Sequence, residues 1–158
     1  MRKLLSSGLV IVAGVVCSPA PVSPFQTHSA PTSDFRNDPR LTAIRSFFER
    51  TDCPAKNYAH IFLEAADDYN LDWRLLPSLS FVESTGGKAA HNNNLFGWDS
   101  GRASFSTPTA GIYAVGYQLA HAGTYRHKNL DTLLAAYNPV DDYPRKVKAI
   151  MRQIAPHQ

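Results

Sequence analysis

One segment of this chain joins an apolar helix pattern to a polar end: Leu75-Leu76-Pro77-Ser78-Leu79-Ser80-Phe81-Val82-Glu83-Ser84-Thr85-Gly86-Gly87-Lys88. Its aliphatic residues recur at helical spacing and predict one buried helix face, formed by Leu75, Leu76, Leu79 and Val82. Glu83 lies four residues after Leu79 and takes the next position on that face. An acid therefore stands where the pattern predicts a core residue.

This position suits a carboxylic acid that keeps its proton. Burial disfavours the charged form of a carboxyl group, and general acid catalysis needs the protonated form near neutral pH. Gly86 and Gly87 are expected to end the helix, which places Glu83 in its last turn, at the edge of the core. The alternative is a solvated surface glutamate, which is the commoner role near a helix end.

Length and composition predict one exported domain. The chain has 158 residues, of which 44% are hydrophobic and 18% charged, so most of it can fold around one core. Residues 1–20 are predicted to be a signal peptide, because a basic start precedes an apolar run, Leu4 to Val16, that is short for a membrane span. Lipidation at Cys17 and an uncleaved anchor are the alternatives.

The remaining sequence predicts a linker followed by a monomeric domain. Residues 21–39 are rich in Pro, Ser and Thr and are expected to form a flexible linker, and residues 40–158 form the domain. We expect a protein of the bacterial periplasm, cell envelope or extracellular space that meets a membrane only through its export segment. Arg2 and Lys3, in the predicted signal peptide, supply two of the charges in the formal net charge of +3. The rest of the chain is therefore close to neutral, and no basic surface is expected that would indicate nucleic acid as a partner.

Helical periodicity predicts a mainly α fold, a helical bundle with a small β-hairpin or loop region beside a cleft. Asp72 is the expected N-cap of the helix that carries Glu83. Residues 86–109 are rich in Gly and Asn and predict loops, with at most a small hairpin around Asp99-Ser100-Gly101. One further helix is expected to begin near Pro39, and four more are expected over residues 56–69, 109–121, 129–137 and 143–154.

The loop region carries side chains that suit a carbohydrate cleft. Sugars offer hydroxyl groups to amides and flat C–H faces to aromatic rings, which Asn94, Phe96 and Trp98 can contact. Core packing is the alternative for Phe96, and capping a turn or orienting Glu83 are the alternatives for Asn94. No hydrolase serine motif, phosphate-binding glycine loop or His-Glu-x-x-His motif occurs in the sequence, and no metal or cofactor is expected.

Three motifs follow one another along the chain: Leu76-Pro77-Ser78, Val82-Glu83-Ser84-Thr85-Gly86-Gly87-Lys88 and Asn93-Asn94-Leu95-Phe96-Gly97-Trp98. Further matching segments are Tyr69-Asn70-Leu71-Asp72, Phe105-Ser106-Thr107-Pro108 and Ala136-Tyr137-Asn138-Pro139 with Tyr143. Together they resemble the glucosaminidase domain of bacterial peptidoglycan hydrolases, which is mannosyl-glycoprotein endo-beta-N-acetylglucosaminidase-like and related to the lysozyme-like lytic transglycosylases. The resemblance covers residues 41–154.

The resemblance implies a lysozyme-like α+β fold and cleavage of β-1,4 bonds in the glycan strands of peptidoglycan. Glu83 matches the catalytic general acid of the family, and Tyr137 matches an aromatic residue that lines the cleft. The expected substrate-binding residues are Ser84, Asn94, Phe96, Trp98 and Tyr137.

One feature departs from the pattern that the resemblance implies. Glycosidases usually need a second carboxylate, yet no glutamate follows Glu83 in the sequence. Asp99 is the candidate second carboxylate. The alternatives are assistance by the substrate's own N-acetyl group, a one-acid transglycosylation that forms an anhydro product, and a module that binds peptidoglycan without cutting it.

Overall fold

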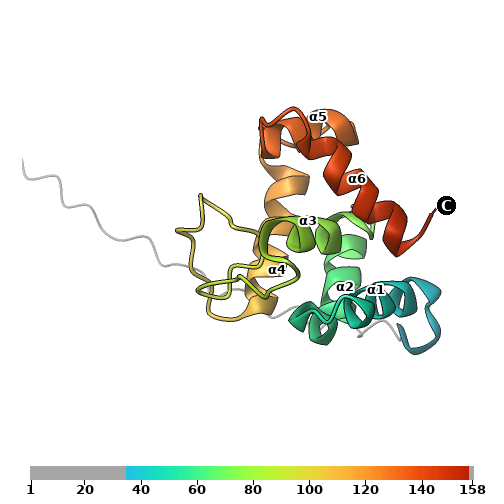
Figure 1. Ribbon diagram of the computed structural model, residues 1–158. Helices are drawn as coiled ribbons and strands as arrows, with labels where there is room; N and C mark the ends of the chain where they lie inside the picture. The colour runs from blue at the N-terminus through green and yellow to red at the C-terminus, as the bar shows by residue number, and fades with distance from the viewer. Residues whose placement is uncertain (1–34, 157–158) are drawn as a thin grey trace, which may run out of the picture. The chain divides into compact units, whose positions relative to one another are not determined.

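The chain folds mainly into helices, as its periodicity predicts. The computed structural model describes residues 35–156, which contain six α-helices and two short 3-10 helices (Figure 1). In chain order these are η1 (Phe35–Asn37), α1 (Pro39–Arg50), η2 (Pro54–Tyr58), α2 (Ala59–Asp68), α3 (Leu75–Ser84), α4 (Pro108–His121), α5 (Leu130–Tyr137) and α6 (Tyr143–Ile154). None of these helices is long and apolar enough to cross a membrane.

Helical structure begins within the last residues of the predicted linker. The predicted signal peptide, residues 1–20, lies outside the described residues, as does most of the predicted linker. The end of that linker is ordered, because η1 covers Phe35–Asn37 and Pro39 begins α1. The Asp38 side chain accepts a hydrogen bond from the backbone N–H of Arg40 and caps α1.

Loops follow α3, as predicted, and the small hairpin that the sequence allowed around Asp99-Ser100-Gly101 does not form. All three residues have positive φ, at 53°, 54° and 80°, as turn residues can, but the described residues on either side of them belong to no strand. The segment coils on itself instead, and the Gly101 N–H donates to Gly97 O at 2.8 Å. Within residues 35–156 the sole strand-like pairing is a single bridge between His91 and Asn94.

Two helix starts also differ from prediction. The helix expected over residues 56–69 divides into η2 and α2. Asp72 does not cap α3, which begins at Leu75 with Arg74 as its cap residue. The Asp72 carboxylate instead accepts from the backbone N–H of Arg74 at 2.9 Å, and Leu75 N–H donates to Asp72 O at 2.8 Å. Asp72 thus stabilises the turn that leads into the helix.

Helix α3 is buried on almost every side. Leu75, Leu76 and Leu79 of the predicted apolar face are in the core, and Val82 packs against it half-buried. Even Ser78 and Ser80 are fully buried, and their hydroxyl groups form no hydrogen bond with any group of residues 35–156. The helix packs against α6 and α2, in the middle of the helices in Figure 1. A helix enclosed in this way is fixed in position by the whole core.

The end of α3 has an unusual conformation. Thr85 follows the helix in the left-handed region, at φ 53°, and its N–H donates to Phe81 O at 2.9 Å. The Gly86 N–H then donates to Ser80 O at 3.1 Å, a pattern that closes helices. The left-handed turn therefore begins one residue before the glycine pair that the sequence indicated, on a β-branched residue that seldom adopts it.

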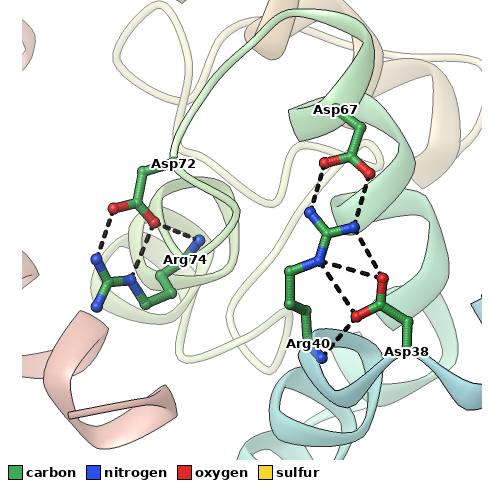
Figure 2. A network of polar contacts seen from close by, with 5 residues as sticks. All are labelled: Asp38, Arg40, Asp67, Asp72 and Arg74. Carbon is green, nitrogen blue, oxygen red and sulfur yellow. Dashed lines mark hydrogen bonds and ion pairs between the residues drawn. The ribbon is translucent and has the colours of Figure 1, made fainter. Parts of the chain in front are cut away.

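Ion pairs and hydrogen bonds of two arginines, Arg40 and Arg74, connect the ends of these helices; Figure 2 shows their ion pairs. The Arg40 guanidinium lies between two carboxylates and donates to Asp38 Oδ2 and Asp67 Oδ1, both at 2.8 Å. It thereby joins the cap of α1 to the end of α2. Arg74 donates to Asp72 at 2.7 Å and to Ala155 O at 3.2 Å, which joins the start of α3 to the end of α6.

We expect Arg40→Ala to lower the free energy of unfolding by about 1 kcal/mol near pH 7, because the network is partly solvated. The hydrogen bonds from Arg40 lower the pKa of Asp38. This stabilisation is present above the ordinary aspartate pKa, about 3.9, and is lost as pH falls through the lowered value. The difference between the variant and the parent should shrink below about pH 4. Urea unfolding at both pH values tests this.

Arg45→Ala is the matched control, because Arg45 is an exposed arginine on the same helix. Equal losses for the two variants would show that the pairs of Arg40 add nothing to stability.

Candidate functional site

A cavity of about 550 Å³ opens beside the last turn of α3. Its walls come from the end of that helix, from the loop that follows it, from the turn after α4 and from the end of α5. The lining residues are Glu83, Phe96, Gly97, Trp98, Asp99, Ser100, Tyr125, Tyr137 and Asn138. The cavity therefore gathers residues that are far apart in the sequence around one carboxyl group.

The Glu83 carboxyl group is held from two sides. The Tyr143 hydroxyl donates a hydrogen bond to Glu83 Oε1 at 2.6 Å. On the other side lies Gly97, where a Cβ atom would come within 3.3 Å of Glu83 Oε2. Gly97 also has φ 56°, in the left-handed region that favours glycine. Glu83 itself is partly exposed to the cavity.

Two stacked tyrosines support this arrangement. The rings of Tyr137 and Tyr143 are nearly parallel, with centroids 5.8 Å apart and an interplanar angle of 11°. The Tyr137 hydroxyl donates to Phe96 O at 2.9 Å. Burial raises the pKa of both tyrosines, and the nearby Glu83 raises it further. Both hydroxyl groups therefore keep their protons at neutral pH and remain donors.

Aromatic rings form the wall next to Glu83. Trp98 contacts Tyr137 at 5.7 Å and Tyr125 at 6.1 Å between ring centroids, and Tyr125 contacts Tyr137 at 6.4 Å. The three rings come from the loop, from the end of α5 and from the turn after α4. The structure thus brings Trp98 and Tyr137, two of the predicted site residues, to the same cavity as Glu83.

Ser84 and Asn94 do not line the cavity, and both are buried. The Ser84 hydroxyl donates to Leu95 O at 2.7 Å and accepts from the Gly87 N–H at 3.0 Å. The Asn94 amide accepts from Trp98 N–H at 2.9 Å and donates to Trp98 O at 3.0 Å. Both side chains hold the loop in place. For Asn94 this is the turn-capping alternative that the sequence left open.

Phe96 and Asp99 have different surroundings. The Phe96 ring is 1% exposed and contacts Phe62 in the core, so its contribution to the cavity wall is small. Asp99 lies at the rim, exposed, and forms an ion pair of 2.6 Å with Arg102. The candidate second carboxylate is therefore already paired with a cation.

Sequence reasoning assigned no site role to Tyr125, Tyr143 and Gly97. Tyr143 begins the predicted last helix, 60 residues from its partner Glu83. No local pattern connects residues at that separation. Tyr125 lies in the turn after α4, where the sequence has no hydrophobic periodicity to show which side chains face inward. Its position next to Trp98 depends on how α4 packs. Gly97 stood within a recognised motif, but its contact with a carboxyl group is visible only in three dimensions.

No protein-family model matches this chain, and no curated protein matches it significantly. Within residues 35–156, no three His, Cys, Asp or Glu side chains gather as a metal site would require. The groups that the cavity offers for chemistry include Glu83, held by Tyr143, and the aromatic wall.

We expect Gly97→Ala to move the Glu83 carboxyl group, because the new methyl group would lie 3.3 Å from Oε2. The left-handed backbone adds a cost of about 1 kcal/mol. Gly101→Ala is the matched control, since Gly101 also has positive φ but no atom lies within 4 Å of its added Cβ.

Carboxyl carbon chemical shifts, measured by NMR, should change at Glu83 in the Gly97 variant and stay the same in the Gly101 variant. Urea unfolding should show a loss of stability in both. An unchanged Glu83 resonance in Gly97→Ala would contradict the proposed contact.

Proposed function

We propose that this chain is a lysozyme-like hydrolase of peptidoglycan that cleaves β-1,4 bonds of the glycan strands, in the manner of an endo-β-N-acetylglucosaminidase. Glu83 is the general acid in this proposal. The observation that carries it is the position of Glu83, in the wall of a cavity whose neighbouring surfaces are aromatic rings and an amide. We further propose that the protein acts outside the cytoplasm, as its predicted export signal implies.

The walls of the cavity suit a sugar ring. Trp98, Tyr125 and Tyr137 offer flat apolar faces, and Asn138 and Ser100 offer groups that can hydrogen-bond to hydroxyls. The volume of about 550 Å³ falls within the usual range for small-ligand sites. A carboxyl group at the side of such a platform can reach the oxygen that links two sugars.

The reaction begins with proton transfer. Glu83 donates its proton to the glycosidic oxygen as the bond from that oxygen to the anomeric carbon breaks, so the leaving sugar departs with a free hydroxyl. A water molecule then bonds through its oxygen to the electron-deficient anomeric carbon, and Glu83, now a carboxylate, accepts one proton from that water, which leaves a free sugar and restores the acid. Tyr143 holds the carboxyl group through its hydrogen bond to Oε1.

The second candidate is a lytic transglycosylase acting on the same strands, and the pairing of Asp99 favours it. Glu83 and Asp99 are the two carboxylates that line the cavity, and Asp99 is exposed and bound to Arg102. Transglycosylation does not need a second carboxylate, because a hydroxyl group of the substrate itself attacks the anomeric carbon and closes an anhydro ring. Mass spectrometry separates the two, since anhydro products are lighter by one water.

Glu83→Gln should remove most of the activity and leave the fold intact. The amide keeps the size of the carboxyl group but cannot deliver a proton, and general acid catalysis is typically worth about a hundred- to ten-thousand-fold. Release of soluble fragments from purified sacculi measures the effect. Asp99→Asn is the matched control at the cavity rim, and a loss as large as that of Glu83→Gln would assign Asp99 the second catalytic role.

Full activity in the folded Glu83→Gln variant would end the hydrolase proposal. If the variant and the parent both bind sacculi and neither releases fragments, the chain is a binding module.

Tyr143→Phe should lower kcat by about tenfold, the usual effect of losing one hydrogen bond to a reacting group. KM should change little, because the ring still stacks on Tyr137. Tyr137→Phe is the control, since it removes a similar buried hydroxyl whose hydrogen bond goes to Phe96 O. Equal effects in the two variants would assign Tyr143 a structural role only.

A further inference from the structure

Aromatic rings and carboxylates lie together on a surface formed by α2, the residue that follows it, and α4. We call it the tyrosine–carboxylate surface, and it consists of Glu64, Asp68, Tyr69, Tyr113, Tyr117 and His121. None of these residues lines the cavity that contains Glu83. The function of this surface is therefore a separate question from that of the cavity.

The rings of this surface are packed in a defined order. Tyr113, Tyr117 and His121 follow one another at four-residue spacing along α4 and share one face of the helix. The Tyr69 ring meets all three nearly at right angles, with centroids 5.8 to 6.2 Å away. Gly116 makes room for it, because a Cβ there would lie 2.8 Å from the Tyr69 ring.

The outer rings of the surface face solvent. Tyr117 is 51% exposed and is one of two large hydrophobic side chains exposed to this degree within residues 35–156. Its ring is stacked on that of His121, with centroids 4.4 Å apart and an interplanar angle of 21°. The stack covers one face of the Tyr117 ring and restricts its motion, while about half of the residue stays exposed. A ring held in this way loses little conformational entropy when it binds a partner.

Two acids lie at the edge of these rings. Glu64 and Asp68 are four residues apart on α2, so they share a side of that helix. Burial raises the pKa of Tyr113, and the charges of Glu64 and Asp68 raise it further. Neither acid forms an ion pair with a basic side chain in the part of the chain that the structure describes. The carboxylates thus leave a local negative charge beside the rings.

We propose that the tyrosine–carboxylate surface binds a lysine or arginine side chain of a peptide partner. The faces of aromatic rings attract ammonium and guanidinium groups through their quadrupole. The two carboxylates add Coulomb attraction, which is strongest for a group held against a partly dehydrated surface. A neutral sugar would stack on the rings and donate hydrogen bonds to the acids, but only an organic cation also gains from their negative charge. This proposal is independent of the function of the cavity.

The test is a titration with a capped Gly-Lys-Gly peptide, followed by NMR of the ring protons of Tyr117 and His121. The control peptide carries Nε-acetyl-lysine, which keeps the shape and removes the charge. We expect saturable shifts with the lysine peptide and at least a tenfold weaker interaction with the acetylated one. Equal shifts with both peptides would overturn the proposal. Larger shifts with a neutral β-1,4 N-acetylglucosamine trimer would assign the surface to sugars instead.

Variants of the same protein separate the rings from the charge. Tyr117→Leu should weaken binding about threefold or more, whereas Tyr117→Phe keeps the ring and should bind as the parent does. Asp68→Asn should weaken binding about twofold or more, and the effect should fall with added salt. Asp141→Asn removes an equal charge from an exposed loop and is the control. Unchanged binding in Tyr117→Leu and in Asp68→Asn would contradict the proposal.

Discussion

The burial of α3 is the constraint on which the rest of the structure depends. Leu75, Leu76 and Leu79 pack into the core, and even Ser78 and Ser80 are enclosed with no hydrogen-bond partner in the part of the protein that the structure describes. Leaving a buried hydroxyl unpaired costs about 1–3 kcal/mol, so the surrounding packing has to compensate for both. The result is a helix that cannot tilt or slide without disturbing the whole core. Its last turn, where burial ends, is therefore a fixed position for a carboxyl group.

Side chains, not a β-sheet, organise the loop beside that helix end. The Ser84 hydroxyl and the Asn94 amide bind backbone groups of the loop, and the Asn93 amide donates to Phe105 O at 2.9 Å. Buried backbone groups must be paired, and here short polar side chains take the place of a neighbouring strand. Because these contacts do not require an extended backbone, residues of the loop can adopt left-handed conformations. One of them is Gly97, which lies against Glu83.

The sequence was informative where an interaction is local. Leucine spacing predicted the buried face of α3 and the location of Glu83 at its end, because both follow from one helical period. It was less informative at Asp99-Ser100-Gly101, where it allowed a hairpin, because turn residues do not determine whether the segments on either side of them pair, and here the described flanking residues belong to no strand. It also missed the contact between Tyr143 and Glu83, because packing of α6 on α3 and not sequence spacing determines which side chains meet there.

That contact makes the order of folding matter for the site. Tyr143 lies in the first turn of α6, 60 residues after Glu83, so the two meet only when the last helix docks on the core. Closing so long a loop is slow compared with forming the local helices. The carboxyl group thus receives its hydroxyl partner only once α6 has docked. A chain that ends before α6 would carry the acid but lack the completed pair.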